Sequence, residues 1–313
     1  MMPTILLLES VAEEADALLR QRARVFTAWG ERPLADILSA EPVDAIITRG
    51  KGLIDGQLLD QCPSVKVVAR CGVGLDNVDV AEATRRGIRV VNAPGSNAAT
   101  IAEHTLMLML MAIRNGYRSA EAVRTDNWAW RNRYAGDELS GKTLGILGLG
   151  NIGGRVARLG EAFGMNVITW SRRDTPYPAL PLEEVLRQSD VISLHLPLTD
   201  ETRYLFDAAR FSLLKPGAIL VNTARGALIE RNALLSALNS GQLAAFAADV
   251  LEEEPPAVGD VLVHHPNAVI TPHSGSLTAT TYRAMCLSTV RNVLAILYGE
   301  PFEAKSVFNR KEL

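Results

Sequence analysis

The stretch T-L-G-I-L-G-L-G-N-I-G, residues 143–153, decides the fold of this chain. Its first five residues form a short apolar run that is typical of a buried parallel strand. Apolar residues then recur at helical spacing from 152 to 163, and Gly164 ends this pattern. Residues 166–170 are again typical of a buried strand. A strand, a glycine-rich turn, a helix and a second strand within about 30 residues predict a βαβ unit that binds a dinucleotide.

The glycines of the turn have separate physical tasks. Gly148 permits the tight turn, Gly150 lets the backbone approach a pyrophosphate, and Gly153 lets the helix pack closely on the strand. A pyrophosphate binds well at a helix N-terminus because backbone N–H groups point outward there. A βαβ unit with incidental glycines is the alternative, and the flanking patterns disfavour it. We therefore expect cofactor contacts from Gly148, Gly150, Asn151, Ile152 and Gly153.

The residues after the second strand indicate which dinucleotide binds. An acidic residue there would bond the ribose hydroxyls of NAD and repel a 2′-phosphate. This chain has Ser171, Arg172 and Arg173 instead, and arginine suits the bidentate geometry of a phosphate. A solvated basic loop is the alternative, with Asp174 still able to reach a ribose. We expect NADP(H) to be favoured, with NAD(H) as the alternative.

Composition and charge argue against several classes of protein. The 313 residues are enough for two domains, and 48% hydrophobic with 21% charged residues is ordinary for a globular protein. A net charge of −3 without a basic stripe argues against nucleic-acid binding. The longest apolar run, residues 106–113, is far below the ~20 residues that span a bilayer, and no signal-peptide pattern begins the chain. Cys62, Cys71 and Cys286 lack C-x-x-C spacing, so we expect reduced thiols in a cytoplasmic protein.

Strand-like runs alternate with helical stretches, which is typical of an α/β protein with doubly wound parallel sheets. The expected strands form two series, 4–8, 24–27, 45–48, 65–69 and 88–91, and then 143–147, 166–170, 190–194, 218–221, 244–248 and 268–270. Pro94 and Gly95 mark a hinge at residues 92–97. The last long helix, 280–298, is placed to return to the first domain. We expect a Rossmann dinucleotide domain, residues 98–280, inserted in a flavodoxin-like substrate domain, residues 1–97 and 281–313.

Hydride transfer to a carbonyl needs an acid/base group, a cation for the substrate and a group that tunes the acid/base residue. Ligands of doubly wound sheets bind at the carboxyl ends of the strands. His195 ends the strand at 190–194 and His273 follows the strand at 268–270, so position does not separate these two candidates. His104 begins a helix after the hinge, where a structural role explains it equally well.

Two further strand ends supply a cation and carboxylates. Arg225 follows the strand at 218–221, and its guanidinium fork suits a substrate carboxylate. Asp249 and the acidic run at 252–254 follow the strand at 244–248. A solvated loop is the usual explanation of such a cluster. One carboxylate bonded to an imidazole would nevertheless fix its tautomer and raise its pKa.

Motifs spread over nearly the whole chain carry a family resemblance. They are G-V-G-L-D-N-V-D (72–79), N-A-P-G-S-N-A-A-T-I-A-E-H (92–104), the glycine turn, L-H-L-P-L-T (194–199), N-T-A-R-G-A-L-I (222–229), D-V-L-E-E-E-P-P (249–256) and T-P-H-S-G-S (271–276). Together they resemble the D-isomer-specific 2-hydroxyacid dehydrogenases, which are nicotinamide-dependent oxidoreductases acting on CH–OH groups. The resemblance selects His273 between the two histidines.

The resemblance implies a catalytic set of Arg225, Glu254 and His273. Arg225 would hold the carboxylate and carbonyl oxygen of a 2-oxoacid, and His273 would protonate the oxygen after hydride transfer. Glu254 would bond the imidazole and keep it protonated near neutral pH. No metal is implied, because Arg225 and His273 polarise the carbonyl.

The resemblance also implies binding residues. Those for the substrate are Arg49, Val73, Gly74 and Asn97, together with Arg225. Those for the cofactor, beyond the glycine turn and residues 171–173, are His195, Pro197, Thr202, Thr223, Ala224, Asp249, His273 and Gly275. Of these, Thr223, Ala224 and Asp249 would surround the nicotinamide carboxamide.

The most specific expectation is reduction of glyoxylate, hydroxypyruvate or a similar short 2-oxoacid. A short type of 3-phosphoglycerate dehydrogenase is the first alternative, and Arg131 is the sequence hint of a phosphate pocket. A dinucleotide-sensing binding protein is a remote alternative. The family resemblance further suggests a homodimer built on the nucleotide domain.

Overall fold

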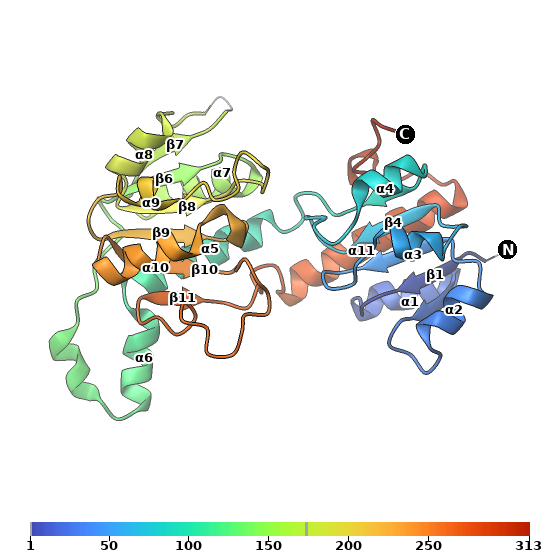
Figure 1. Ribbon diagram of the computed structural model, residues 1–313, viewed down its shortest axis with the longest axis horizontal. Helices are drawn as coiled ribbons and strands as arrows, with labels where there is room; N and C mark the ends of the chain where they lie inside the picture. The colour runs from blue at the N-terminus through green and yellow to red at the C-terminus, as the bar shows by residue number, and fades with distance from the viewer. Residues whose placement is uncertain (1, 173–174) are drawn as a thin grey trace. The chain divides into compact units, whose positions relative to one another are not determined.

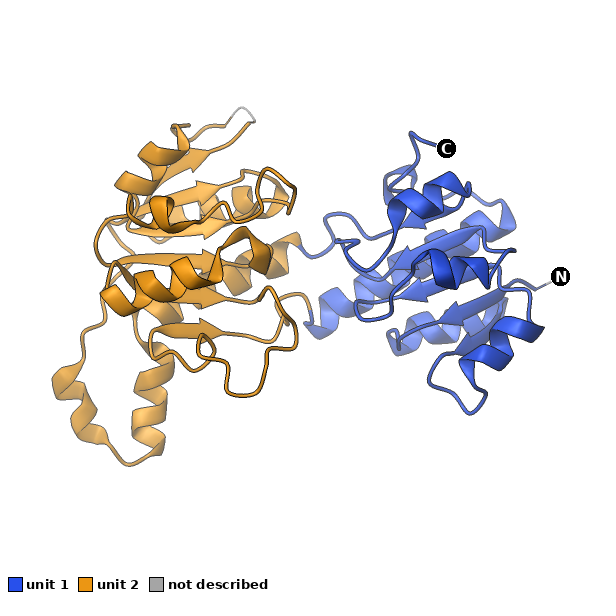
Figure 2. Ribbon diagram, in the orientation of Figure 1, with its two compact units in different colours: residues 1–97, 277–313 blue, residues 98–276 orange. Residues whose placement is uncertain are grey.

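The computed structural model describes residues 2–172 and 175–313. The chain forms two compact units (Figures 1 and 2). Unit 1 comprises Met1–Asn97 and Leu277–Leu313, and unit 2 comprises Ala98–Ser276. Each unit has its own parallel sheet with helices on both faces, so the prediction of two doubly wound α/β domains is confirmed.

Unit 1 is built on a five-stranded parallel sheet with the order β2-β1-β3-β4-β5. This is the flavodoxin-like order. The strands are β1 (Thr4–Leu7), β2 (Arg24–Thr27), β3 (Ala45–Thr48), β4 (Val67–Arg70) and β5 (Arg89–Val91). Helices α1 (Glu13–Arg22) and α11 (Ala279–Tyr298) pack on one face, and α2 (Leu34–Ala40), α3 (Gly56–Asp60) and α4 (Val80–Arg85) on the other. A short 3₁₀ turn, η3 (Ala304–Ser306), lies near the C-terminus.

The first strand shows why this sheet is covered on both faces. Ile5 and Leu7 pack in the cluster with α1 and α11, whereas Leu6 packs in the opposite cluster. Successive side chains of a strand point to opposite faces, so an unbroken apolar strand requires cover on both sides. The last helix α11 provides part of that cover and ends at Gly299, whose φ of 68° suits glycine.

Unit 2 is built on a six-stranded parallel sheet with the order β11-β10-β9-β8-β6-β7. The strands are β6 (Thr143–Leu147), β7 (Asn166–Trp170), β8 (Val191–Leu194), β9 (Ala218–Asn222), β10 (Leu243–Ala248) and β11 (Ala268–Ile270). Helices α5 (Ala98–Ile113) and α7 (Asn151–Ala162) pack on one face, and α8 (Leu182–Gln188), α9 (Ala208–Phe211) and α10 (Arg231–Ser240) on the other. The remaining elements are α6 (Gly116–Arg124), η1 (Trp128–Arg133) and η2 (Gly226–Leu228), and Figure 1 shows α6 and η1 extending away from the sheet.

The strand order of unit 2 differs in one detail from the sequence-based expectation. In a Rossmann sheet the third strand lies beside the second. The third expected strand, now β8, instead pairs with β6. A single parallel bridge between Thr169 and Ala179 occupies the place beside β7. Counting that bridge as the third strand restores the Rossmann order, so His195 follows the fourth strand of the motif.

The other expected elements form close to their predicted bounds. Strands β2, β3, β6, β7 and β11 have the expected residues, whereas the strand expected at 65–69 begins later, at Val67. The three cysteines are buried thiols. In the described residues, no helix is long and apolar enough to cross a membrane.

Candidate active site

The glycine-rich turn follows β6 and is shaped by two close approaches. Gly148 has a φ of 96°, and a Cβ there would lie 2.6 Å from the backbone oxygen of His195. A Cβ on Gly153 would lie 2.1 Å from the backbone oxygen of Gly148. Both positions therefore exclude larger residues. At Gly150 the situation is the opposite, since no described atom lies within 4 Å of an added Cβ.

The start of α7 fits the pyrophosphate of a dinucleotide. Gly150 is the N-cap of α7, and no side chain among the described residues caps this helix end. The first N–H groups of an α-helix have no partner within the helix, so they are available to an anion. Asn151 is exposed and Ile152 is partly buried at this end. When bound, a nicotinamide dinucleotide would supply hydride chemistry here.

Arg172, the described arginine after β7, is exposed. Arg172 Nη2 lies 2.7 Å from Glu201 Oε2, and these side chains are 84% and 74% exposed. An ion pair so exposed contributes at most ~1 kcal/mol, so the guanidinium can readily exchange partners. Ser171 precedes it, and Arg173 lies outside the described residues.

His195 follows β8 directly and lies against the glycine turn. Its Nε2 lies 2.9 Å from Ser193 Oγ, a hydroxyl and not a carboxylate. Burial lowers the pKa of His195 to about 3, so the ring is neutral at physiological pH. The loop that follows is held by Thr202, whose hydroxyl donates to the backbone oxygen of Pro197 at 2.7 Å.

His273 follows β11 and pairs with Glu254, which follows β10. Nδ1 of His273 donates to Glu254 Oε2 at 2.7 Å. This hydrogen bond raises the pKa of His273, against the opposing effects of burial and of the positive charge of Arg225. Glu254 also accepts a hydrogen bond from Leu251 N at 2.8 Å. Because Nδ1 is engaged, Nε2 is the ring nitrogen left to exchange a proton with a substrate.

The loop that carries Arg225 is pressed against the loop that carries Glu254. A Cβ on Gly226 would lie 2.0 Å from the backbone carbon of Leu251, so only glycine permits this approach. Asn222 Nδ2 donates to the backbone oxygen of Arg225 at 2.8 Å, which fixes the chain at the end of β9. The structure thus brings Arg225, Glu254 and His273 together from the ends of three neighbouring strands.

Asp249 holds the segment on both sides of His273. Its buried carboxylate accepts hydrogen bonds from Thr271 Oγ1 (2.6 Å), Ser274 N (2.9 Å) and Gly275 N (2.8 Å). Burial alone would raise the pKa of Asp249, but hydrogen bonds from His104, Thr271 and these amides outweigh burial and lower it. Between the residues that Asp249 holds, His273 has a φ of 52°, a left-handed conformation uncommon for a non-glycine residue.

Helix α5 supports the same strand ends through residues that the sequence analysis left open or missed. His104 Nε2 lies 2.9 Å from Thr271 Oγ1 and 3.3 Å from Asp249 Oδ1. Thr105 Oγ1 lies 2.8 Å from Thr223 Oγ1, and both side chains are buried. Ala224, beside Thr223, donates its N–H to Asn222 Oδ1 at 3.0 Å. His104 therefore has a polar partner at the site. Its expected place at the start of a helix gave no indication of this contact in the sequence.

The residues expected to bind substrate in unit 1 lie after adjacent strands. Arg49 follows β3, Val73 and Gly74 follow β4, and Asn97 follows β5. The carboxyl ends of parallel strands meet at one edge of a sheet, which groups these positions within unit 1. The backbone oxygen of Val73 accepts a hydrogen bond from Asn92 Nδ2 at 2.7 Å.

Comparison with known proteins identifies the family of this chain. Residues 106–275 match the family described as D-isomer specific 2-hydroxyacid dehydrogenase, NAD binding domain. The chain is 41% identical over 315 residues to a glyoxylate reductase of Aeropyrum pernix, covering 95% of this chain and 94% of that protein. It is 38% identical over 308 residues to a D-3-phosphoglycerate dehydrogenase of Mycobacterium tuberculosis, covering 96% of this chain and 58% of that protein.

A solved structure is similar in fold to this chain. The TT0316 protein from Thermus thermophilus is 40% identical, with a TM-score of 0.88, and the match covers 95% of this chain and 97% of that one. The sequence match, the fold and the glycine-rich turn therefore all indicate the same family. The chain belongs to the D-isomer specific 2-hydroxyacid dehydrogenase family and is an NAD(P)-dependent oxidoreductase.

Proposed function

We propose that this enzyme reduces glyoxylate, hydroxypyruvate or a similar short 2-oxoacid, with NADPH as the preferred reductant. The observation that carries the chemistry is the 2.7 Å pair of His273 and Glu254, with the charge of Arg225 acting on the same imidazole. Two of the similar curated proteins, from Aeropyrum pernix and Pyrococcus furiosus, carry the name glyoxylate reductase, at 41% and 37% identity.

Arg225 and His273 divide the work on the substrate. The Arg225 guanidinium binds the carboxylate and polarises the carbonyl oxygen through its bidentate fork. Hydride adds to the carbonyl carbon, and the C=O π electrons move to oxygen. His273 Nε2–H gives its proton to that oxygen, leaving a neutral imidazole and a 2-hydroxyacid. The reverse reaction uses the neutral His273 as the base.

Glu254 sets the protonation state that reduction needs. The carboxylate stabilises the imidazolium and fixes the ring so that Nε2 remains the exchanging nitrogen. No metal is required by this mechanism, since the charges of Arg225 and His273 act directly on the oxygen. Asp249 has a supporting task, because it holds the residues that flank His273.

We assign the cofactor to unit 2, and the substrate contacts other than Arg225 and His273 to unit 1. The proposed cofactor residues are those of the glycine turn, residues 171–173 and the strand-end residues His195, Pro197, Thr202, Thr223, Ala224, Asp249, His273 and Gly275. The uncapped start of α7 and the open space at Gly150 support this assignment. In unit 1 the proposed substrate contacts are Arg49, Val73, Gly74 and Asn97.

The cofactor preference is tested with Arg172→Ala. Loss of a phosphate-binding arginine should lower kcat/KM for NADPH about tenfold and leave kcat/KM for NADH nearly unchanged. Arg187→Ala is the matched control, because Arg187 is also exposed in unit 2 and pairs with a glutamate, Glu184, at 3.3 Å. Higher kcat/KM with NADH in the unmutated enzyme would refute the NADPH proposal.

The substrate is tested by measuring kcat/KM for glyoxylate, hydroxypyruvate, pyruvate and 3-phosphohydroxypyruvate under equal conditions. We expect the first two to be preferred. A preference for the phosphorylated acid would favour 3-phosphoglycerate dehydrogenase activity, the function named for the Mycobacterium tuberculosis relative, and would make the exposed Arg131 a phosphate contact. Tight dinucleotide binding without turnover of any acid would favour a sensing role.

We further propose a homodimer formed through unit 2. A groove of about 500 Å³ on α5 is lined largely by apolar side chains, including Leu106, Met107, Leu110 and Leu159. Trp128 on the neighbouring extension is 67% exposed. Apolar surface of this kind is typical of an interface between protein chains. Light scattering should therefore give twice the 33.9 kDa of the chain.

A further inference from the structure

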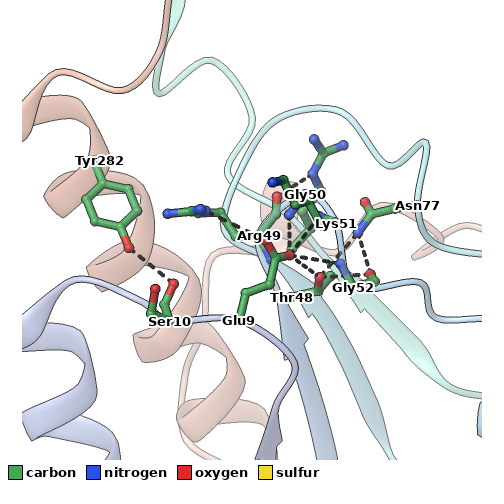
Figure 3. Close-up of polar contacts among 10 residues, drawn as sticks. Glu9, Ser10, Thr48, Arg49, Gly50, Lys51, Gly52, Asn77 and Tyr282 are labelled. Atoms are coloured by element: carbon green, nitrogen blue, oxygen red, sulfur yellow. Dashed lines mark hydrogen bonds and ion pairs between the residues drawn. The ribbon is translucent and has the colours of Figure 1, made fainter. Parts of the chain in front are cut away.

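One carboxylate oxygen in unit 1 collects an unusual number of hydrogen bonds. Oε2 of Glu9 accepts from the Thr48 hydroxyl at 2.9 Å. It also accepts from four successive backbone amides, those of Arg49 (2.9 Å), Gly50 (2.6 Å), Lys51 (2.8 Å) and Gly52 (3.0 Å). Figure 3 shows these bonds converging on Glu9. Successive N–H groups that point at one spot form an anion-binding nest, and here the anion belongs to the chain itself.

The sheet register places Glu9 in this nest. Strands β1 and β3 pair in parallel with Leu7 opposite Ile47, so Glu9 and Arg49 follow at the same level. Gly52 is needed for the loop to close over this spot, because a Cβ there would lie 2.6 Å from Leu8 Cβ and 2.8 Å from Thr48 Oγ1. Asn77 Nδ2 donates to the backbone oxygen of Gly52 at 2.7 Å and holds the far end of the loop.

Glu9 is held in its ionised form at neutral pH. Its side chain is only 12% exposed, and burial alone would raise its pKa. The hydrogen bonds from the amides of Gly50, Gly52 and Arg49 and from the Thr48 hydroxyl outweigh burial and lower the pKa of Glu9 to about 2. The negative charge therefore persists at every pH at which the enzyme would work.

The same loop presents the side chain of Arg49. The backbone oxygen of Arg49 accepts from Arg70 Nε at 2.8 Å, so both sides of the residue are fixed. Its guanidinium lies 5.6 Å from the ring centre of Tyr282, and its Nε lies 3.9 Å from Glu9 Oε1 (Figure 3). The hydroxyl of Tyr282 donates to the backbone oxygen of Ser10 at 3.2 Å. Arg49 is thus held on its backbone by Glu9 and beside its side chain by Tyr282.

We propose that Glu9 is a positioning residue for substrate binding, which fixes the 49–52 loop and aims Arg49 at the substrate carboxylate. The inference rests on the proposed function, in which Arg49 contacts the 2-oxoacid. Glu9 also fills the nest with an internal charge. The loop amides are consequently closed to the substrate carboxylate, so the group that this loop can offer to the substrate is the Arg49 guanidinium.

The test compares Glu9→Gln with Glu9→Ala. Gln keeps an acceptor oxygen without the charge, and Ala removes both. We expect KM for the 2-oxoacid to rise about tenfold with Gln and further with Ala, because charged hydrogen bonds to the loop are weakened and then lost. We expect kcat to change less than about twofold and cofactor Kd to be unchanged, since neither depends on how Arg49 is aimed. Glu41→Gln is the matched control, because Glu41 is an ion-paired carboxylate of unit 1 that bonds Arg24 and Arg32 at 2.9 Å.

A double-mutant cycle separates positioning from general support of the fold. In an Arg49→Gln background, Glu9→Gln should raise KM little further, because both substitutions act through one guanidinium. Additive effects on KM would overturn the proposal, and so would a rise in KM accompanied by parallel losses of kcat and thermal stability. Unchanged KM in Glu9→Ala would also overturn it. Absence of turnover by the unmutated enzyme with every 2-oxoacid would instead overturn the proposed function, and the inference with it.

Discussion

His195 and His273 occupy similar places in unit 2 and have opposite protonation chemistry. His195 follows β8 and His273 follows β11, so both lie at the carboxyl edge of the same parallel sheet. Burial lowers the pKa of His195 to about 3. The hydrogen bond to Glu254 raises the pKa of His273. One ring is therefore neutral near pH 7, and the other is stabilised as a cation.

The difference comes from neighbours supplied by other elements. The partner of His195 is the Ser193 hydroxyl, two residues back on its own strand. The partner of His273 is a carboxylate from the loop after β10. A carboxylate stabilises an imidazolium far more than a hydroxyl does, since only the carboxylate carries the opposite charge. The end of one strand thus positions each histidine. The partner that a neighbouring loop supplies, or does not supply, determines whether the imidazole is stabilised as a cation.

The largest expected effect is that of His273→Ala. Loss of the proton donor should lower kcat for 2-oxoacid reduction by about 10³-fold, within the usual range for general acid catalysis. Cofactor Kd should change only a few-fold, because the proposed pyrophosphate site lies at the start of α7. Titration of cofactor fluorescence and steady-state kinetics measure the two quantities.

The control for that substitution is His264→Ala, since His264 is an exposed histidine in the loop before β11. The His264→Ala variant should keep a kcat close to that of the unmutated enzyme. If the His273→Ala variant kept most of its turnover, the proton donor would have to be another group. The difference in pKa between His195 and His273 would then not explain catalysis.

The fold could be predicted well because its signals are local. Apolar runs specify the buried strands, and the G-x-G-x-x-G spacing specifies the turn before α7. The third Rossmann strand escaped prediction because it consists of one bridge at Ala179, which has no apolar run to reveal it. The return of α11 to unit 1 followed from its place after the last strand, and its apolar face does pack there.

The site could be predicted only in part, because several of its contacts join distant residues. The pairing of Glu254 with His273 came from the family resemblance, since three adjacent glutamates are equivalent by composition. The hydrogen bond from Thr271 to Asp249 joins the ends of two strands, and no local sequence pattern predicts it. Glu9 lies 40 residues before the first amide that it accepts from, so only the pairing of β1 with β3 reveals its role.

An intermediate effect is expected from Glu254→Gln. The carboxylate raises the pKa of His273, so its removal should lower that pKa. In the proposed mechanism, reduction requires protonated His273 and fails as pH rises through this pKa. The alkaline limb of kcat/KM for reduction should therefore move to lower pH, by about one unit for a paired charge, and activity just above neutrality should fall about tenfold.

The pH profile of the reverse reaction provides an internal check on Glu254→Gln. Oxidation requires the neutral ring, so its acidic limb should move to lower pH by the same amount. Glu253→Gln is the matched control, because it removes the adjacent carboxylate of the same acidic run. A limb that moved equally in both variants would indicate a general charge effect in place of the specific pair.

The smallest expected effect is that of His195→Gln. His195 is already neutral above about pH 4 because burial lowers its pKa to about 3, so exchanging the ring for a neutral amide removes no charge. The amide can still bond the Ser193 hydroxyl. We expect kcat within about threefold of the unmutated value, unmoved limbs of the pH profile, and a few-fold rise in cofactor KM, because the backbone of His195 contacts the turn at Gly148. A hundredfold loss of kcat or a shifted alkaline limb would show that this second histidine exchanges the proton, which would reverse the assignment of the two strand ends.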